Sequence, residues 1–176
     1  MAQSDQESDI LERLSDTSNV RGFIITSVEV FEEAVDSLIQ RIFRKDDFAV
    51  KSVVGPLLDN SGPLGEITVR LKLLLGLGVV SHNIYQDIDA FLKLRDFLNS
   101  DGNDYCFTDP KILQPIKKMH AVQNMGVVQL EIASPGDDVD LIFYQMQLAR
   151  QEQIIKSALA LAIAGICNEL GRDSPF

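Results

Sequence analysis

The C-terminal segment, residues 139–170, constrains the fold most because it contains no proline and only one glycine, Gly165. Proline and glycine are the residues that most often interrupt a helix, so the segment predicts one long helix or two joined helices. Its apolar run at residues 154–167 is shorter than the roughly 20 apolar residues that cross a bilayer. We therefore expect a buried core helix and no membrane span. Small side chains let a neighbouring helix approach it closely, at Ala158, Ala160, Ala162 and Ala164.

A second long helix is predicted over residues 20–44, which contain no proline. Apolar side chains recur there at alternating spacings of four and three residues, the period of one helix face, at Ile24, Val28, Phe31, Val35, Leu38 and Ile42. The opposite face is acidic, as is typical of a face in contact with water.

Turn-forming residues divide the rest of the chain into shorter predicted helices. A helix at 46–54 is expected to end at Gly55 and Pro56, because proline disfavours a helical residue before it, and residues 55–65 form a turn-rich connector. Further helices are predicted at 64–75, at 82–99 with Ser81 as its cap, and for a short stretch from Pro110 onward. For residues 124–138 a strand, a loop and a helix all remain open.

These elements predict an all-α fold: a single-domain multi-helix bundle with long helices in the N-terminal half and at the C-terminus. With 176 residues, 45% of them hydrophobic, the chain is large enough to bury one core. Residues 1–18 carry five acids and one base and are expected to form a loosely docked acidic arm, followed by one helical domain at 19–172. The N-terminus has no apolar signal segment, and two unpatterned cysteines fit a reduced cytoplasm.

Residues suited to catalysis are scarce and unpatterned. The two histidines, His82 and His120, lie in no frame that pairs them with a second metal ligand. Cys106 and Cys167 fit no nucleophile motif, and the glycines form no phosphate-binding loop. We therefore predict neither catalytic activity nor a metal or cofactor; an unrecognised helical enzyme is a distant alternative.

Direct nucleic-acid binding is disfavoured by charge. The net charge is −10, whereas a nucleic-acid binder normally presents a basic face. Residues 71–98 loosely imitate a helix-turn-helix, yet the second helix carries three acids, Asp87, Asp89 and Asp96, against two bases. Phosphates would repel these acids, which favours an ordinary helical hairpin.

The most basic part of the chain lies where the second long helix ends. Four bases outnumber two acids there: Arg41, Arg44, Lys45 and Lys51 against Asp46 and Asp47. A cationic patch on an anionic protein attracts an acidic partner. The alternative is that these charges form exposed ion pairs at a helix junction, each of which contributes little.

Several segments resemble the mannitol operon repressor family: RGFIIT at 21–26, FRKDDFAVK at 43–51, PLLDNSGPLG at 56–65, VRLKL at 69–73, and residues 94–105 and 107–109. The resemblance implies an all-α intracellular protein that represses genes of mannitol uptake and use, without a recognised DNA-binding element or catalytic residues. It adds Asp59, Pro63 and Leu64 of the connector to the candidate contact residues.

Together, residues and resemblance predict a cytoplasmic transcriptional regulator, with residues 19–172 as the regulator domain. We expect it to act through a protein partner, another regulatory or phosphotransferase-system protein. The first alternative is a repressor that binds operator DNA directly. The sequence leaves self-association open.

Overall fold

The computed structural model describes residues 2–43, 48–59, 61–132, 136 and 140–172. Every regular element in these residues is helical, which confirms the predicted all-α class. In chain order the elements are α1 (Ala2–Ser15), α2 (Val20–Ile42), α3 (Phe48–Leu58), α4 (Ile67–Gly76), α5 (His82–Ser100), α6 (Pro110–Lys117), the 3-10 turn η1 (His120–Val122) and α7 (Leu141–Gly171).

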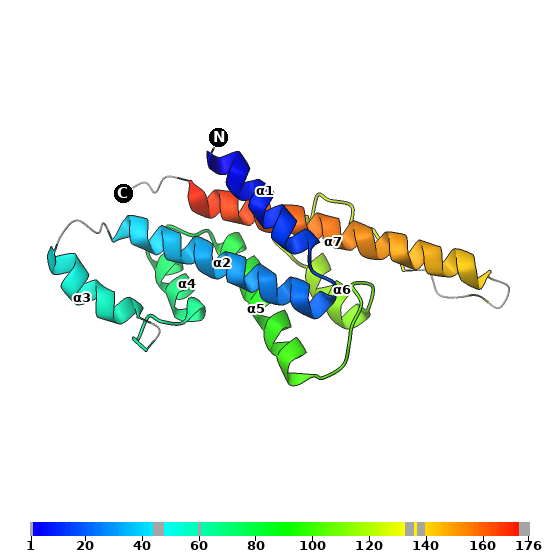
Figure 1. The fold of residues 1–176 in the computed structure, drawn as a ribbon, viewed down its shortest axis with the longest axis horizontal. Coiled ribbons are helices and arrows are strands. Elements are labelled where there is room, and N and C mark those ends of the chain that lie inside the picture. Colours follow the sequence, from blue (N-terminus) through cyan, green and yellow to red (C-terminus); the bar gives the residue numbers. More distant parts are fainter. Residues whose placement is uncertain (1, 44–47, 60, 133–135, 137–139, 173–176) are drawn as a thin grey trace.

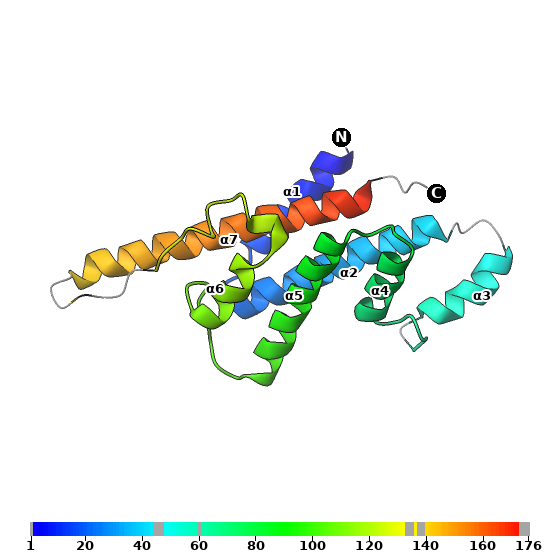
Figure 2. The same cartoon turned by 180° about the vertical axis from the view of Figure 1, so that it is seen from behind.

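Helix α2 is the centre of the bundle and packs against α1, α4, α5 and α7 (Figure 1, Figure 2). Asn19 caps it by accepting a hydrogen bond from the N–H of Gly22 at 2.7 Å. The predicted stripe is buried from Ile24 to Leu38, and Ile42 is half-buried. Neighbours on a second side also bury the row Phe23, Val30 and Ala34.

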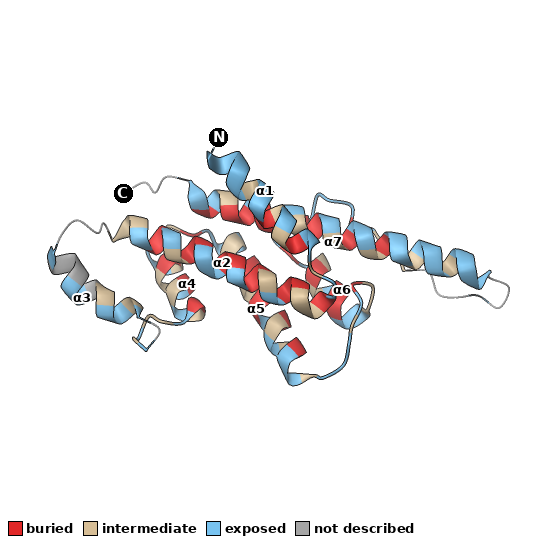
Figure 3. Cartoon of the chain, in the orientation of Figure 1, coloured by how far each residue is buried: buried red, intermediate tan, exposed pale blue. Residues whose placement is uncertain are grey.

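Helix α7 is one continuous helix, capped by Asp140, whose carboxylate accepts a hydrogen bond from the N–H of Ile142 at 3.1 Å. Its buried residues begin at Gln151, so only its C-terminal part is a core helix; the part before it is exposed (Figure 3). In the described part of the chain, α7 is the one helix long and apolar enough to cross a membrane, and half of its most apolar window is buried inside the fold.

The N-terminal segment differs from the loosely docked arm that its acidity predicts. It forms α1, which packs along α7 (Figure 1), with Ile10 and Leu14 buried in the common core. Arg13 donates to both carboxylate oxygens of Glu33 on α2, at 2.8 and 2.9 Å. Two buried apolar side chains and one bidentate ion pair are enough to hold an otherwise acidic helix.

The end of α3 also differs from the prediction, because the helix continues through Gly55 and Pro56 to Leu58. The turn that follows is closed by the N–H of Asp59, which donates to the carbonyl of Gly55 at 3.2 Å. Pro56 lies in the last turn of α3 and has no N–H, so the helix lacks one backbone hydrogen bond to the preceding turn, while the N–H groups after the proline can still donate.

The remaining short elements follow the sequence closely. Ser81 caps α5 by accepting from the N–H of Ile84 at 3.3 Å, and α6 starts at Pro110 and ends at Lys117. Gly78 takes a φ of 73° in the turn between α4 and α5, a conformation that favours glycine. The described residues of 124–138 form turns and irregular backbone rather than a strand.

Candidate functional site

The connector between α3 and α4 folds back onto the last turn of α3. The N–H of Gly62 donates to the carbonyl of Asp59 at 2.6 Å, and the N–H of Leu64 donates to the carbonyl of Leu57 at 2.8 Å. A Cβ atom at Gly62 would lie 2.3 Å from the carbonyl oxygen of Pro56, so this close approach requires glycine. The loop is therefore compact and has a defined shape.

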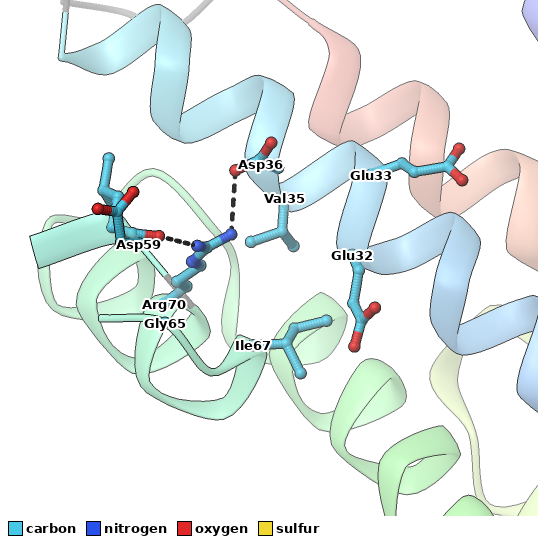
Figure 4. A pocket seen from close by; sticks show the side chains of 9 residues that line it. Glu32, Glu33, Val35, Asp36, Asp59, Gly65, Ile67 and Arg70 are labelled. Atoms are coloured by element: carbon cyan, nitrogen blue, oxygen red, sulfur yellow. Dashed lines mark hydrogen bonds and ion pairs between the residues drawn. The ribbon is translucent and has the colours of Figure 1, made fainter. Parts of the chain in front are cut away.

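Arg70 of α4 holds this connector against α2 (Figure 4). Its Nε donates to the carbonyl of Leu64 at 2.7 Å, its Nη2 donates to the carbonyl of Leu58 at 2.6 Å, and its Nη1 pairs with Asp36 Oδ1 at 3.0 Å. The Arg70 side chain is 12% exposed. One guanidinium thus joins three elements with charge-assisted hydrogen bonds.

A groove of about 460 Å³ lies between α2 and the connector (Figure 4). Its acidic side chains outnumber its one base, Arg70: they are Glu32, Glu33, Asp36 and Asp59. Two of these acids face cations on other helices, since Glu33 binds Arg13 and Glu32 lies 3.8 Å from Arg95. The described wall of the candidate site is consequently more acidic than the sequence suggested.

Arg41 does not face this groove with a free cation. Its guanidinium donates to the carbonyls of Leu170 at 2.5 Å, Gly171 at 3.1 Å and Arg172 at 3.3 Å, at the end of α7. A cation at a helix C-terminus satisfies carbonyls that lack partners within the helix. Arg41 therefore caps the end of α7. The sequence alone predicts Arg41 in the contact surface, because no local pattern reveals partners that lie 129 to 131 positions away.

The other predicted contact residues are only partly visible. Arg44, Lys45, Asp46 and Asp47 lie outside the described residues, as does the side chain of Lys51 in α3. Asp59 and Pro63 are exposed and Leu64 is half-buried. The structure adds Arg70 and Asp36, which sequence reasoning missed; the available signal was that Arg70 lies within the VRLKL segment that carries the family resemblance.

Histidine and cysteine side chains form no catalytic constellation in the described residues. His120 Nε2 lies 2.8 Å from Gln86 Oε1, while the backbone N–H groups of His120 and Ala121 donate to the buried Asp87. Burial raises the pKa of Cys167 to about 12, so this thiol stays protonated at neutral pH. Among the described side chains, no group of three or more His, Cys, Asp and Glu could hold a metal ion.

Helix α5 is the second helix of the segment at residues 71–98 that loosely imitates a helix-turn-helix. In the structure it is a core element. It buries Ile88, Phe91, Leu92, Leu94 and Leu98 and packs against α2, α4, α6 and η1. Its cations are engaged: Lys93 pairs with Asp89 at 2.8 Å, and Arg95 lies 3.3 Å from Asp96. The exposed side of α5 therefore offers phosphates few free positive charges.

Fold and site define an all-helical protein with an acidic groove beside a connector that hydrogen bonds hold in place. A family model described as "Mannitol repressor" matches residues 6–171. The chain belongs to the mannitol repressor family, as its sequence segments indicated.

Individual relatives agree with this placement. The chain is 41% identical to the mannitol operon repressor of Escherichia coli K12 over 170 residues, covering 97% of this chain and 85% of the relative. It is also 28% identical over 167 residues to a protein of the same strain named fumarase E, covering 93% and 96%.

Two solved structures share the fold. The MtlR–HPr complex from E. coli matches with a TM-score of 0.88 and 40% identity, covering 96% of this chain and 99% of the other. A possible transcriptional regulator, YggD of Shigella flexneri 2a, matches with a TM-score of 0.79 and 26% identity, covering 93% and 98%.

Proposed function

We propose that this protein is a cytoplasmic repressor of mannitol uptake and utilisation genes, and that it acts through a protein partner. The observation that carries the proposal is the E. coli structure, in which a relative with 40% identity is in complex with HPr. HPr is a protein of the phosphotransferase system. A partner of the same kind would link repression to sugar transport, and the proposal requires no cofactor.

Charge supports a protein partner over operator DNA. The net charge of −10 produces repulsion from DNA over the molecule as a whole, and α5 holds its two cations in contacts with acids. Binding DNA requires many free cations to neutralise phosphates. A protein partner can instead match a surface of mixed charge.

We place the partner contact on the connector surface, which we define as residues 44–47, α3 and the α3–α4 loop. Its charged and loop residues are Arg44, Lys45, Asp46, Asp47, Lys51, Asp59, Pro63 and Leu64. Arg70 supports this surface by holding the loop in place. Loops positioned by rigid helices commonly carry binding functions, and this one is fixed at both ends.

The decisive experiment reverses the two adjacent cations, Arg44→Glu with Lys45→Glu. Exposed ion pairs contribute only about 0–1 kcal/mol, so we expect unchanged helicity and melting, together with lost HPr binding in a pull-down and lost repression of a mannitol-operon reporter. The matched control reverses two exposed lysines elsewhere, Lys72→Glu with Lys118→Glu, and should repress normally. Full repression by the first variant would place the contact on another surface.

The proposed role is regulatory, and the relatives named fumarase E make the catalytic alternative easy to test. Hydration of fumarate needs a placed acid and base, and the side chain that His120 Nε2 contacts, Gln86, is neither an acid nor a base. We expect the purified protein to leave the absorbance of a fumarate solution unchanged. Formation of malate at a rate that heat denaturation abolishes would contradict a purely regulatory role.

A further inference from the structure

The first part of α7, residues 141–150, extends beyond the rest of the bundle; we name it the α7 tip. Both opposite views show it projecting past the other helices (Figure 1, Figure 2). No residue of the tip is buried, and the buried residues of α7 begin directly after it, at Gln151. Its side chains therefore meet solvent rather than the core (Figure 3).

The α7 tip is apolar even though it is exposed. Residues 141–149 include no charged side chain, and Leu141, Ile142, Phe143 and Met146 are 64–70% exposed. Clustered apolar side chains of this size on a surface mark an interaction site.

The exposed apolar side chains form a seam along one side of the tip. Ile142, Met146 and Ala149 recur at spacings of four and three, and Phe143 lies beside them. Such spacing is typical of a helix that packs against another helix. Tyr144, which is half-buried, lies on the opposite side of the tip.

The charges at the two ends of the tip fit a second copy of the same chain. Asp140 caps one end, and Arg150 lies at the other, exposed and without an ion-pair partner in the described part of the chain. The sequence places two more acids, Asp137 and Asp138, just before Asp140. Two tips packed antiparallel would bring each Arg150 level with the acidic end of the partner's tip, because both copies share the same spacing of about 15 Å between these ends.

We propose that two copies of this chain associate through their α7 tips, antiparallel about a two-fold axis. The seam side chains of each tip pack against those of the other, and each Arg150 faces the acidic end of the partner's tip. Such an isologous contact is the commonest form of self-association. At a net charge of −10 per copy, the uncharged tip is also where two copies approach with least repulsion.

The size of the contact sets what to measure. A pair of ten-residue helices buries less than the roughly 1,600 Å² of a standard interface, so we expect a weak dimer that dissociates on dilution. Sedimentation equilibrium of the full chain over a series of concentrations measures this. A chain that stays monomeric at the highest attainable concentration overturns the proposal.

Two matched variants locate the contact. Met146→Glu introduces a carboxylate in the seam of each copy and should raise the dimer dissociation constant at least about tenfold, equivalent to about 1.4 kcal/mol. The control, Val53→Glu, makes the same kind of change at a comparably exposed site on α3, where the side chain is 65% exposed. The control should dimerise as the parent does; equal effects of both variants, or none, would rule out the tip.

Cysteine cross-linking tests the antiparallel arrangement in a Cys106→Ser background, which removes the exposed native thiol. Met146 lies near the middle of the tip, so Met146→Cys should form a disulfide between copies. Ile142 lies near one end and would be far from its own counterpart, so Ile142→Cys should not. Efficient cross-linking of Ile142→Cys would indicate a parallel pair and contradict the antiparallel arrangement.

Discussion

At the scale of single residues, two arginines hold distant parts of the chain together. Arg70 ties the connector to α2, and Arg41 ties the end of α2 to the end of α7. Each uses several donors on backbone carbonyls, which a lysine could not match with one ammonium group. Arg70 thereby keeps the loop of the candidate site in place, and Arg41 fixes the ends of the two long helices to each other.

Replacing Arg70 should therefore destabilise the protein. Arg70→Met keeps most of the side-chain volume and removes all three hydrogen bonds. A hydrogen bond to a charged group contributes about 1.5–3 kcal/mol, but three bonds from one guanidinium contribute less than three times that amount, because they are not independent. We expect a loss of about 2 kcal/mol in the free energy of unfolding, measured by urea titration. Arg172→Met, at a side chain that is 69% exposed, is the matched control and should change little; equal stability of both variants would contradict the role given to Arg70.

The two cysteines should differ in reactivity and in their effect on stability with pH. The pKa of Cys167 is raised to about 12 because the thiol is buried, so the folded state holds this proton more tightly than the unfolded chain. Its contribution is complete below the ordinary pKa of 9.0 and is lost as pH rises toward 12. Cys167→Ala should reduce the decline in the free energy of unfolding above pH 9.0, and denaturant titrations at several pH values would show this.

The two thiols should also differ in reactivity, because Cys106 is exposed and Cys167 is buried. In the native parent protein, a thiol reagent should modify Cys106 and spare Cys167.

At the scale of elements, α7 has two parts that its sequence does not separate. The small, apolar residues of its second part lie in the core, whereas equally apolar residues of its tip are exposed. Periodicity shows that a helix has an apolar side, but only neighbours decide whether that side is covered. The same reason explains why the docking of α1 was not predicted. Its few apolar residues, which include Ile10 and Leu14, did not indicate that a neighbouring helix would cover them.

Adjacent residues of α7 allow a sharp test of this division. Ala162 is 3% exposed and Leu161 is 53% exposed. Ala162→Asp would bury a carboxylate without a partner, at a cost of roughly 2–7 kcal/mol, out of a typical domain stability of about 5–15 kcal/mol. We expect Ala162→Asp to melt far lower or fail to fold and Leu161→Asp to melt close to the parent; similar melting of the two would place Ala162 outside the core.

At the scale of the whole molecule, charge dominates what the protein can bind. Acids outnumber bases by ten, and the described arginines of α2, α4 and α5 are engaged by carbonyls or carboxylates. The long-range field is thus anionic, and it repels nucleic acid.

We accordingly expect no specific complex between the purified protein and mannitol-promoter DNA at physiological salt. Mobility-shift assays at several salt concentrations test this, because a phosphate-driven complex weakens steeply as salt rises. The comparison sample contains HPr as well as the protein and DNA. A tight, sequence-selective complex of protein and DNA alone would favour the direct repressor.

The sequence by itself determined the two long helices, the starts of α5 and α6 and the sign of the net charge. An apolar period, a cap such as Ser81 and a proline such as Pro110 act within a few residues, and charge is a simple sum, so neither depends on the rest of the fold. It also indicated the family, because the matching segments are contiguous. Tertiary structure alone decided the partners of Arg41 and Arg70, the docking of α1, the acidic groove and the exposed α7 tip. These depend on contacts between residues far apart in the chain, and no local pattern encodes which helix will lie against which.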